Sequence, residues 1–280
     1  MNWQSIIQRQ QGWTIDEADF FRLSVDEATE LYVNAPLHEL TKAADSRRKK
    51  FHPDGKVTYL VDRNVNYTNI CTINCQFCSF YRPPGHDENY TQSYQEISER
   101  IRELEEIGGS RILMQGGVNP ELEFSWYIDL IKHLVREHPN IDLDCFSPIE
   151  IQGIAEVSGM TTFEVLHQLK EAGLHGLPGG GAEMLVEEVR KDVSPKKGHP
   201  DNWLMVMEEA QSLGLTTSAQ MFSVLANLCA NVSNIWLKFE IYKIPLLKNT
   251  IMALPHLLLG RFSLNQIPSA KEIVVKTSLF

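Results

Sequence analysis

The sequence predicts an α/β fold: a partial (βα) barrel that follows an N-terminal helical extension and has lost or replaced its C-terminal strands. Short apolar runs alternate with longer amphipathic segments from residue 56 to residue 221, which is typical of parallel strands joined by helical crossovers. Each presumptive strand ends in a loop with Gly, Pro or polar residues, as expected where loops build a site at the C-terminal face of a barrel. After residue 221 the alternation stops.

The composition is that of a globular protein with an acidic surface. The 280 residues include 43% hydrophobic and 22% charged residues, with a formal net charge of −10. Such a charge disfavours nucleic acid and anionic membranes as partners. The sequence has no apolar stretch of roughly 20 residues that could span a bilayer, and its first residues lack the pattern of a secretory signal. We therefore expect a cytoplasmic protein.

Residues 1–55 form the predicted helical extension. Ser24 and Glu27 have the spacing of a capping box, which marks the start of one helix. A second helix is expected over residues 37–49, and the His52-Pro53-Asp54-Gly55 sequence predicts a turn after it.

Residues 56–221 form the predicted barrel core. Ser93 with Glu96 and Thr161 with Glu164 are further capping boxes. We treat Asp62, Arg63 and Asn64 as structural residues that precede the first barrel strand. Strands are expected at 57–61, 65–67, 111–114, 141–146, 174–177 and 216–221, and helices at 94–107, 124–137, 162–172, 182–189 and 203–213.

Three cysteines within eight residues form the strongest chemical signal. Cys71, Cys75 and Cys78 have the spacing C-x3-C-x2-C directly after a strand. Thiolates are soft ligands suited to iron–sulfur clusters. A cubane cluster has four irons, so three cysteines leave one iron open to a substrate or cofactor. The spacing thus predicts a [4Fe–4S] cluster.

Two alternatives apply to these cysteines. Zinc prefers four ligands in a paired spacing, and His86 is the nearest downstream candidate for a Cys3His site. Three incidental buried cysteines are the other alternative. The remaining two cysteines, Cys145 and Cys229, are interpreted as small buried hydrophobic residues.

Several segments resemble the radical S-adenosylmethionine (SAM) enzymes of the futalosine route to menaquinone, and dehypoxanthine futalosine cyclases most of all. The resemblance covers residues 56 to about 221. The sister family, the aminofutalosine synthases, shares the cysteine motif and PGGGAE, whereas FYRPPGH, ILMQGG and FSPIEI favour the cyclase. The segments that carry the resemblance are VDRNVNYTNICTINCQFCSFYRPPGHDENY, ILMQGG, FSPIEI, VSGM, LKEAGL and LPGGGAEML.

The resemblance implies a TIM-type radical SAM barrel, a [4Fe–4S] cluster and SAM. It also implies a reaction in which a 5′-deoxyadenosyl radical removes hydrogen from the ribose of dehypoxanthine futalosine. The resulting carbon radical attacks the attached benzoate ring, and loss of an electron and a proton leaves a spirocyclic product. A nucleoside-like small molecule is the expected substrate, and a flavodoxin or ferredoxin the expected electron donor. An aminofutalosine synthase activity and an inactive remnant remain the alternatives.

Candidate site residues follow the strand ends. Phe77 is expected to shield the cluster or contact the SAM adenine, and the loop of Gln115, Gly116 and Gly117 to approach the methionine part of SAM. Glu183, after the glycine-rich sequence of residues 178–181, is the catalytic candidate: it would orient a ribose hydroxyl or accept the departing proton. The glycine-rich sequence itself is a candidate backbone nest at a helix N-terminus.

Three further residues complete the candidate set. Ser147 and Glu150 are candidates for the wall of the SAM or substrate site. Arg82, just past the cysteines, is a candidate partner for a carboxylate, with a surface ion pair as the alternative.

Residues 222–280 depart from the family. Only two of the 36 acidic residues and one of the 17 glycines lie there. Codons can be chosen so that reading from the third base of the Val224 codon gives FGESLRQRVEHLAEIRDLQD, a charged helix of the kind the family has at this place. We therefore hypothesise a frameshift near residues 218–223.

Overall fold

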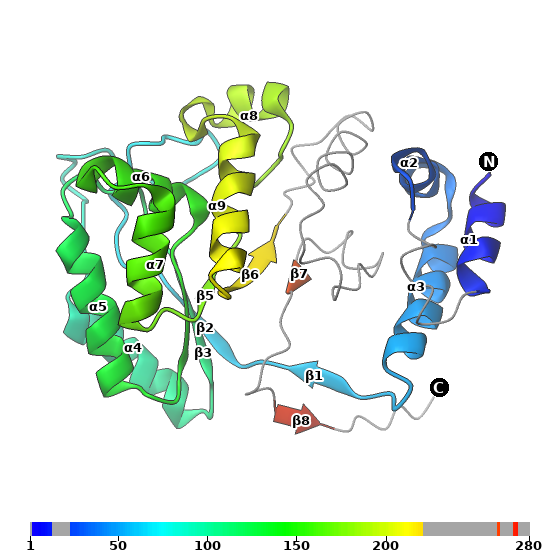
Figure 1. Ribbon diagram of the computed structural model, residues 1–280, viewed down its shortest axis with the longest axis horizontal. Helices are drawn as coiled ribbons and strands as arrows, with labels where there is room; N and C mark the ends of the chain where they lie inside the picture. The colour runs from blue at the N-terminus through cyan, green and yellow to red at the C-terminus, as the bar shows by residue number, and fades with distance from the viewer. Residues whose placement is uncertain (1, 13–22, 221–261, 264–270, 274–280) are drawn as a thin grey trace.

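The computed structural model describes residues 2–12, 23–220, 262–263 and 271–273 (Figure 1). Its helices are α1 (Trp3–Gln11), α2 (Val25–Asn34), α3 (Leu37–Phe51), α4 (Tyr94–Glu106), α5 (Phe124–Glu137), α6 (Pro148–Ser158), α7 (Thr162–Ala172), α8 (Glu187–Val193), the 3-10 turn η2 (Pro195–Lys197) and α9 (Pro200–Ser212). Its strands are β1 (Val57–Tyr59), β2 (Asp62–Val65), β3 (Arg111–Met114), β4 (Asp142–Cys145), β5 (Gly176–Leu177), β6 (Thr216–Ala219), β7 (Phe262–Ser263) and β8 (Lys271–Ile273).

The N-terminal helices have a small core of their own. The predicted capping box starts α2, because the Ser24 hydroxyl accepts from the Glu27 N–H and the Glu27 side chain accepts from the Ser24 N–H. Ile6, Leu31 and Leu40 pack together between α1, α2 and α3. These helices stand at one end of the molecule, and β1 leads from them to the barrel core (Figure 1).

The central sheet has the predicted parallel order. Strands β2, β3, β4, β5 and β6 lie side by side and parallel, and β7 pairs antiparallel with β6. The register places Asp62 opposite Arg111 and Arg111 opposite Asp142. Because successive parallel strands are joined by helices, the sheet curves into a partial (βα) barrel. The fold class predicted from the sequence is confirmed.

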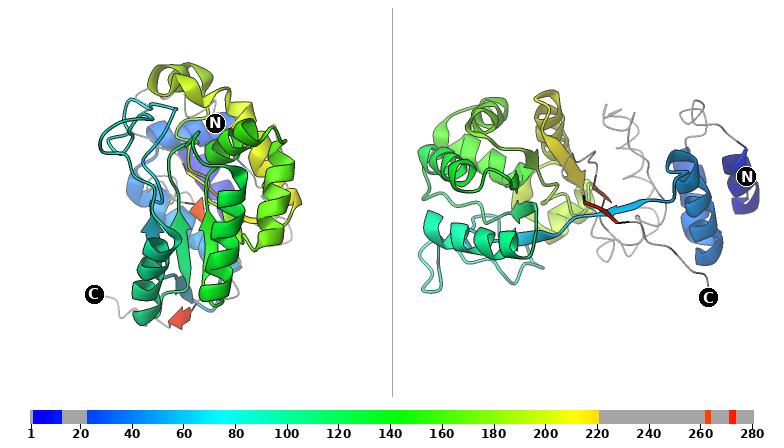
Figure 2. Two further views of the ribbon diagram at one scale, coloured as in Figure 1. Left: turned by 90° about the vertical axis from the view of Figure 1, so that its left-hand side faces the viewer. Right: turned by 90° about the horizontal axis from the view of Figure 1, so that it is seen from below.

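Helices cover the outer face of this sheet (Figure 2). Neighbouring helices touch in the series α4, α5, α7 and α9, with α6 against α7 and α9. Their apolar sides and the strands share one core, in which Tyr67, Tyr127, Phe146 and Trp203 are almost fully buried. Burial of this apolar surface is the main source of stability for the core. Capping boxes at Ser93 and Thr161 start α4 and α7 as predicted.

The first barrel strand differs from the prediction. Asp62, Arg63 and Asn64 do not precede it; they form most of β2, which ends at Val65. The reason is electrostatic. The Asp62 carboxylate forms an ion pair with Arg111 on β3, with 2.6 Å between Oδ2 and Nη2. The Nη1 of Arg111 lies 3.2 Å from the Oδ2 of Asp144 on β4. Arg63 pairs instead with Glu103 on α4, and Asn64 bonds to Asn66. With three polar residues, β2 lacks the apolar run that marks a strand in a sequence.

The segment after the glycine-rich loop also differs. A helix was expected over 182–189, but residues 182–186 form a loop and α8 starts at Glu187. The glycine-rich sequence therefore does not lie at a helix N-terminus. Glu183 has a left-handed φ of 48°, which interrupts a helix.

Helix α6 was not predicted. Ser147 is its N-cap, Pro148 its first residue and Glu150 its third, so that the Ser147 hydroxyl accepts from the Glu150 N–H. In the sequence, Ser147 and Glu150 have the spacing of a capping box, with Pro at the first helical position, and this spacing was the signal available for the helix.

The predictions for residues 222–280 fall mostly outside the described residues, as does Cys229. Only β7 and β8 are described there, and β8 pairs antiparallel with β1. None of the described helices is long and apolar enough to cross a membrane.

Candidate functional site

Four loops gather where β2, β3, β4 and β5 end. They carry the cysteines, the sequence from Gln115 to Gly117, the start of α6 and the glycine-rich loop. Because these strands are parallel neighbours, their carboxyl ends meet at one edge of the sheet. The structure therefore brings together the loops that sequence reasoning singled out one by one.

The cysteine loop is anchored at both ends. Cys71 N–H donates to the Arg82 carbonyl at 2.9 Å, and Thr72 N–H donates to the Val118 carbonyl at 3.1 Å. Asn74 adopts a left-handed φ of 54°, which turns the chain between the first two cysteines. The three cysteines are free and half-buried. Burial raises the pKa of the Cys71 thiol, while backbone N–H groups that point at its sulfur oppose that effect.

The loop offers three free thiols, the soft sulfur donors that an iron–sulfur cluster takes. Within the described residues, no group of three or more His, Cys, Asp or Glu side chains gathers closely enough to hold a single metal ion. His86 uses Nδ1 to accept the Glu88 N–H at 3.0 Å. The thiolates of a cubane bind three different irons, so a cubane does not require the three side chains to converge on a single ion.

Gly117 lets the loop after β3 touch the cysteine loop. A Cβ at Gly117 would lie 2.1 Å from the Ile70 carbonyl oxygen and 2.7 Å from the Cys71 Cβ. A Cβ at Gly116 would lie 2.8 Å from the Tyr67 ring. These glycines are thus required by packing within the chain, whatever ligand the loop receives.

Glu150 also binds the loop after β3, through a buried set of hydrogen bonds. Its Oε1 accepts from the Tyr67 hydroxyl at 2.8 Å and from the Gly116 N–H at 2.9 Å, and its Oε2 accepts from the Ser147 hydroxyl at 2.6 Å. Glu150 is 3% exposed, and burial raises its pKa to about 7 against the lowering effect of these donors. Ser147 and Glu150 therefore form a buried polar network under the loop after β3.

The glycine-rich loop packs against two neighbours. A Cβ at Gly179 would lie 1.9 Å from the Ser218 carbonyl oxygen on β6, and one at Gly180 would lie 2.3 Å from the Gln115 amide nitrogen. Gln115 also donates to the Phe146 carbonyl at 3.2 Å. The side chain of Gln115 thereby links the loops that follow β3, β4 and β5.

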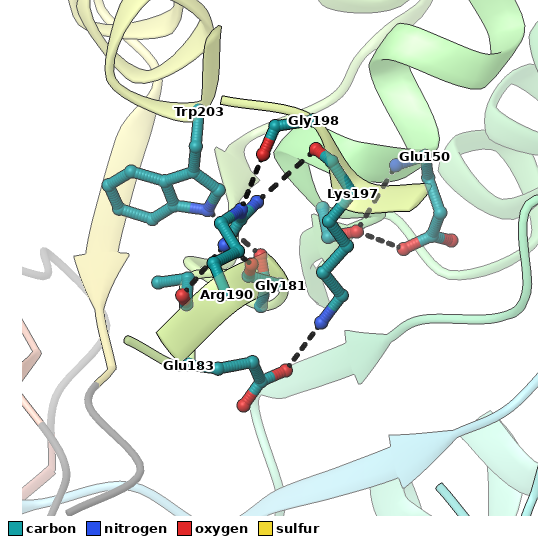
Figure 3. A network of polar contacts seen from close by, with 10 residues as sticks. Glu150, Gly181, Glu183, Arg190, Lys197, Gly198 and Trp203 are labelled. Atoms are coloured by element: carbon teal, nitrogen blue, oxygen red, sulfur yellow. Dashed lines mark hydrogen bonds and ion pairs between the residues drawn. The ribbon is translucent and has the colours of Figure 1, made fainter. Parts of the chain in front are cut away.

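Glu183 faces a lysine from η2. The Lys197 ammonium donates to the Glu183 Oε1 at 2.9 Å (Figure 3). The same ammonium lies 5.3 Å from the centroid of the Phe77 ring, within the range of a cation–π contact. The catalytic candidate and the aromatic residue of the cysteine loop thus share one cation.

Arg82 pairs inside its own loop. Its guanidinium lies 2.6 Å from the Glu88 carboxylate and also donates to the Ser79 and Tyr81 carbonyls. The surface ion pair, and not a free carboxylate-binding arginine, is therefore what the structure contains. Cys145 is fully buried in the core, and its thiol has a strongly raised pKa caused by burial, as expected of a small apolar side chain.

Sequence reasoning missed Tyr67, Arg190 and Lys197. Tyr67 stood in a predicted strand as one apolar residue among others, and its hydroxyl contact with Glu150 spans 83 positions. Arg190 and Lys197 lie in a charged stretch that reads as a solvated surface, yet both are buried. The only available signal was that Pro195 and Gly198 bracket Lys197, which marks a tight turn rather than an exposed helix.

Comparison with known sequences places this site in context. A model of the radical SAM superfamily matches residues 65–226. Cyclic dehypoxanthine futalosine synthase from Halalkalibacterium halodurans is 44% identical over 200 residues, 71% of this chain and 54% of that protein. The synthase of the same name from Streptomyces coelicolor is 34% identical over 203 residues, covering 71% and 51%. The chain spans about half the length of these relatives.

A relative with another printed activity matches a similar share. The 5-amino-6-(D-ribitylamino)uracil–L-tyrosine 4-hydroxyphenyl transferase of Methanocaldococcus jannaschii is 36% identical over 203 residues, covering 71% of this chain and 56% of that protein.

Two solved structures share the fold. The [FeFe]-hydrogenase maturase HydG superposes with a TM-score of 0.60 at 16% identity, covering 85% of this chain and 54% of that one. Methylornithine synthase (PylB) superposes with a TM-score of 0.60 at 15% identity, covering 84% and 63%. At these identities the likeness concerns the fold alone.

Proposed function

The chain belongs to the radical SAM superfamily, and on that premise we propose that it is a cyclase that converts dehypoxanthine futalosine to cyclic dehypoxanthine futalosine in menaquinone biosynthesis. The observation that carries the proposal is the 44% identity to a cyclic dehypoxanthine futalosine synthase over 200 residues. The transferase relative is 36% identical over a comparable length. The FYRPPGH, ILMQGG and FSPIEI segments, which favoured the cyclase at the level of sequence, support the same choice.

Cys71, Cys75 and Cys78 are the proposed ligands of a [4Fe–4S] cluster. When bound, the cluster and SAM supply the radical that removes a hydrogen atom from the substrate. The loop of Gln115, Gly116 and Gly117 lies against the cysteine loop and is the proposed seat of SAM. Such a cluster belongs in a reducing compartment, so the cytoplasm is the proposed location.

The other candidate residues are proposed to position the substrate and the loops or to accept a proton. Glu183, which is 24% exposed at its side chain, is the proposed group that orients a ribose hydroxyl or takes up the departing proton. Phe77 is the proposed shield of the cluster or contact of the SAM adenine. Ser147 and Glu150 act indirectly in this proposal: they hold Gly116 in place and keep the SAM loop rigid.

Product analysis tests the proposal. The purified protein is reconstituted with iron and sulfide without oxygen, reduced with dithionite and mixed with SAM and either dehypoxanthine futalosine or the enol ether substrate of aminofutalosine synthases. The cyclase predicts 5′-deoxyadenosine together with a product that has lost two hydrogens from dehypoxanthine futalosine. If only the enol ether is converted, the chain is an aminofutalosine synthase and the proposed cyclase activity is wrong.

An inactive remnant is the alternative that the departure of residues 222–280 from the family supports. It predicts no product from either substrate, and a Glu183→Gln variant would then be indistinguishable from the parent chain. If the chain is a cyclase, Glu183→Gln lowers kcat by roughly 10²-fold or more, the contribution typical of a positioned acid or base.

A further inference from the structure

Lys197 is a buried cation at the junction of two loops. The residue is 6% exposed, and a lysine at this depth is rare unless it is paired. Its ammonium reaches the Glu183 carboxylate at 2.9 Å and the face of the Phe77 ring at 5.3 Å. Glu183 follows β5 and Phe77 follows β2, and two strands separate β2 from β5. The hydrogen bonds of the sheet therefore do not by themselves determine how the loops of Glu183 and Phe77 are placed relative to each other.

Arg190 fixes the backbone on both sides of this ion pair (Figure 3). Its Nη1 donates to the carbonyls of Gly181 and Ala182 at 2.8 and 2.9 Å, just before Glu183. Its Nε donates to the Gly198 carbonyl at 3.0 Å, and its Nη2 contacts the Lys197 carbonyl at 3.5 Å. Burial lowers the pKa of Arg190 to about 10, so the guanidinium stays charged at neutral pH and uses its rigid fork of donors.

The backbone of Glu183 is held in an unfavourable conformation. Its φ of 48° lies in the left-handed region, which a non-glycine residue adopts only where its surroundings enforce it. The carbonyls that Arg190 grips immediately precede this residue. Such strain is typical of sites where a side chain must point in one direction.

Segment 190–198 also touches the cysteine loop directly. The Gln76 N–H donates to the Val193 carbonyl at 2.9 Å, and the Gln76 amide donates to the Asp192 carbonyl at 2.6 Å. The segment that carries Lys197 is thus docked on the loop that carries Phe77, and a movement of either would move the other.

We propose that Lys197 is a positioning residue, whose ammonium holds the Glu183 carboxylate against the cysteine loop while Arg190 fixes the backbone at both ends of the pair. The inference rests on the proposed function through the role of Glu183. In this arrangement Lys197 touches neither SAM nor substrate, and it sets the direction of the acidic group before either binds. The pair and the backbone around it are held by groups of the chain itself, and such a preorganised pair needs little reorganisation at the moment of reaction.

Proteolysis of the purified protein tests the positioning without any cofactor. An endoproteinase that cuts after glutamate is applied to the parent chain and to Lys197→Met, Lys197→Arg and Lys191→Met, and cleavage after Glu183 is followed by mass spectrometry. Lys191 is the matched control, because its ammonium pairs with Glu187 on the surface of α8. Lys197→Met is expected to cleave about tenfold faster after Glu183, since a charge-assisted hydrogen bond is lost and cleavage follows the opened population. Lys197→Arg and Lys191→Met should cleave like the parent.

Steady-state kinetics of the reconstituted protein tests what the positioning is for. Lys197→Met should lower kcat for the cyclised product about tenfold with an unchanged KM for SAM, and Lys197→Arg should restore most of it. A merely stabilising lysine predicts an unchanged kcat per intact cluster, and that result would overturn the proposal, as would cleavage after Glu183 at the parent rate. If the parent forms no cyclised product, the proposed function fails, whereas the proteolysis still decides whether Lys197 holds Glu183.

Discussion

At the scale of single residues, the Glu150 carboxyl group connects burial to the geometry of the candidate site. It receives hydrogen bonds from the Tyr67 hydroxyl, the Gly116 N–H and the Ser147 hydroxyl, all of which suit an ionised carboxylate. Burial acts in the opposite direction and raises its pKa from 4.5 to about 7. The loop after β3 therefore depends on a group that changes charge close to neutral pH.

This balance predicts how stability depends on pH. Because the folded pKa lies above the unfolded one, the folded protein binds the extra proton between pH 4.5 and 7, and stability falls as pH rises through this window. The size is at most roughly 3 kcal/mol. Urea unfolding at a series of pH values should show this slope in the parent chain and in Glu156→Gln, an exposed control on the same helix. In Glu150→Gln the slope should be largely lost, and an undiminished slope there would show that another group is responsible.

At the scale of elements, the close contacts of the loops depend on glycines that have no Cβ atom. Gly116 and Gly117 make room for the Tyr67 ring and the Ile70 carbonyl, and Gly179 for the Ser218 carbonyl. The cysteine loop and the loop after β3 approach each other closely at the backbone of Gly117. The side chains of Gln115 and Glu150 link the loop after β3 to its other neighbours, so a change in one loop is passed to the next. The cysteine loop and the SAM loop are therefore expected to behave as one unit.

Gly117→Ala tests this unit. The new Cβ would meet the Ile70 carbonyl at 2.1 Å, so the cysteine loop must move at a cost of roughly 1–3 kcal/mol. We expect a lower urea midpoint and less iron taken up on reconstitution. Gly12→Ala is the control, because no atom of the described residues lies within 4 Å of its Cβ position and its φ is −85°. Equal iron uptake by Gly117→Ala and the parent would show that the two loops are independent.

Elements with local signals were predictable from the sequence, and elements set by distant partners were not. The capping boxes at Ser93 and Thr161 located α4 and α7, because the interactions that start those helices lie within four residues. Strand β2 was not predicted at its observed position, because its Asp62 is stabilised by Arg111 from another strand. The loop at residues 182–186 was predicted as a helix, because the hydrogen bonds from Arg190 to the carbonyls of residues 181 and 182 cannot be seen in the sequence.

The candidate site followed the same division. The spacing of the cysteines singled them out in the sequence, and their role as cluster ligands stays a prediction. Lys197 was missed because its burial and its pairing with Glu183 across 14 positions exist only in the folded chain.

At the scale of the whole molecule, the barrel is partial. Five parallel strands are present in the described residues, whereas a complete (βα) barrel of this type has eight. The match to the superfamily model ends at residue 226, close to where the composition changes. The frameshift near residues 218–223 stays our hypothesis for this change, with 1–55, 56–221 and 222–280 as the proposed divisions of the chain.

The nucleotide sequence of the gene tests the frameshift. Reading from the third base of the Val224 codon should give FGESLRQRVEHLAEIRDLQD followed by further strand and helix segments of the family. A chain expressed in that frame should have a higher urea midpoint than the present one, because further strands and helices of the family would bury additional apolar surface. If no single-base slip yields the family pattern, the hypothesis is wrong.

The most direct test of the account is the metal content and SAM cleavage of the anaerobically reconstituted protein. Three cysteine ligands and one open iron predict about four irons per chain, an electron paramagnetic resonance signal that changes when SAM binds, and 5′-deoxyadenosine after reduction. Cys71→Ala, Cys75→Ala and Cys78→Ala should each lose the cluster, while Cys145→Ala, which alters a core thiol, should keep it. Zinc in place of iron, or a cluster that ignores SAM because a fourth side chain binds it, would contradict the account.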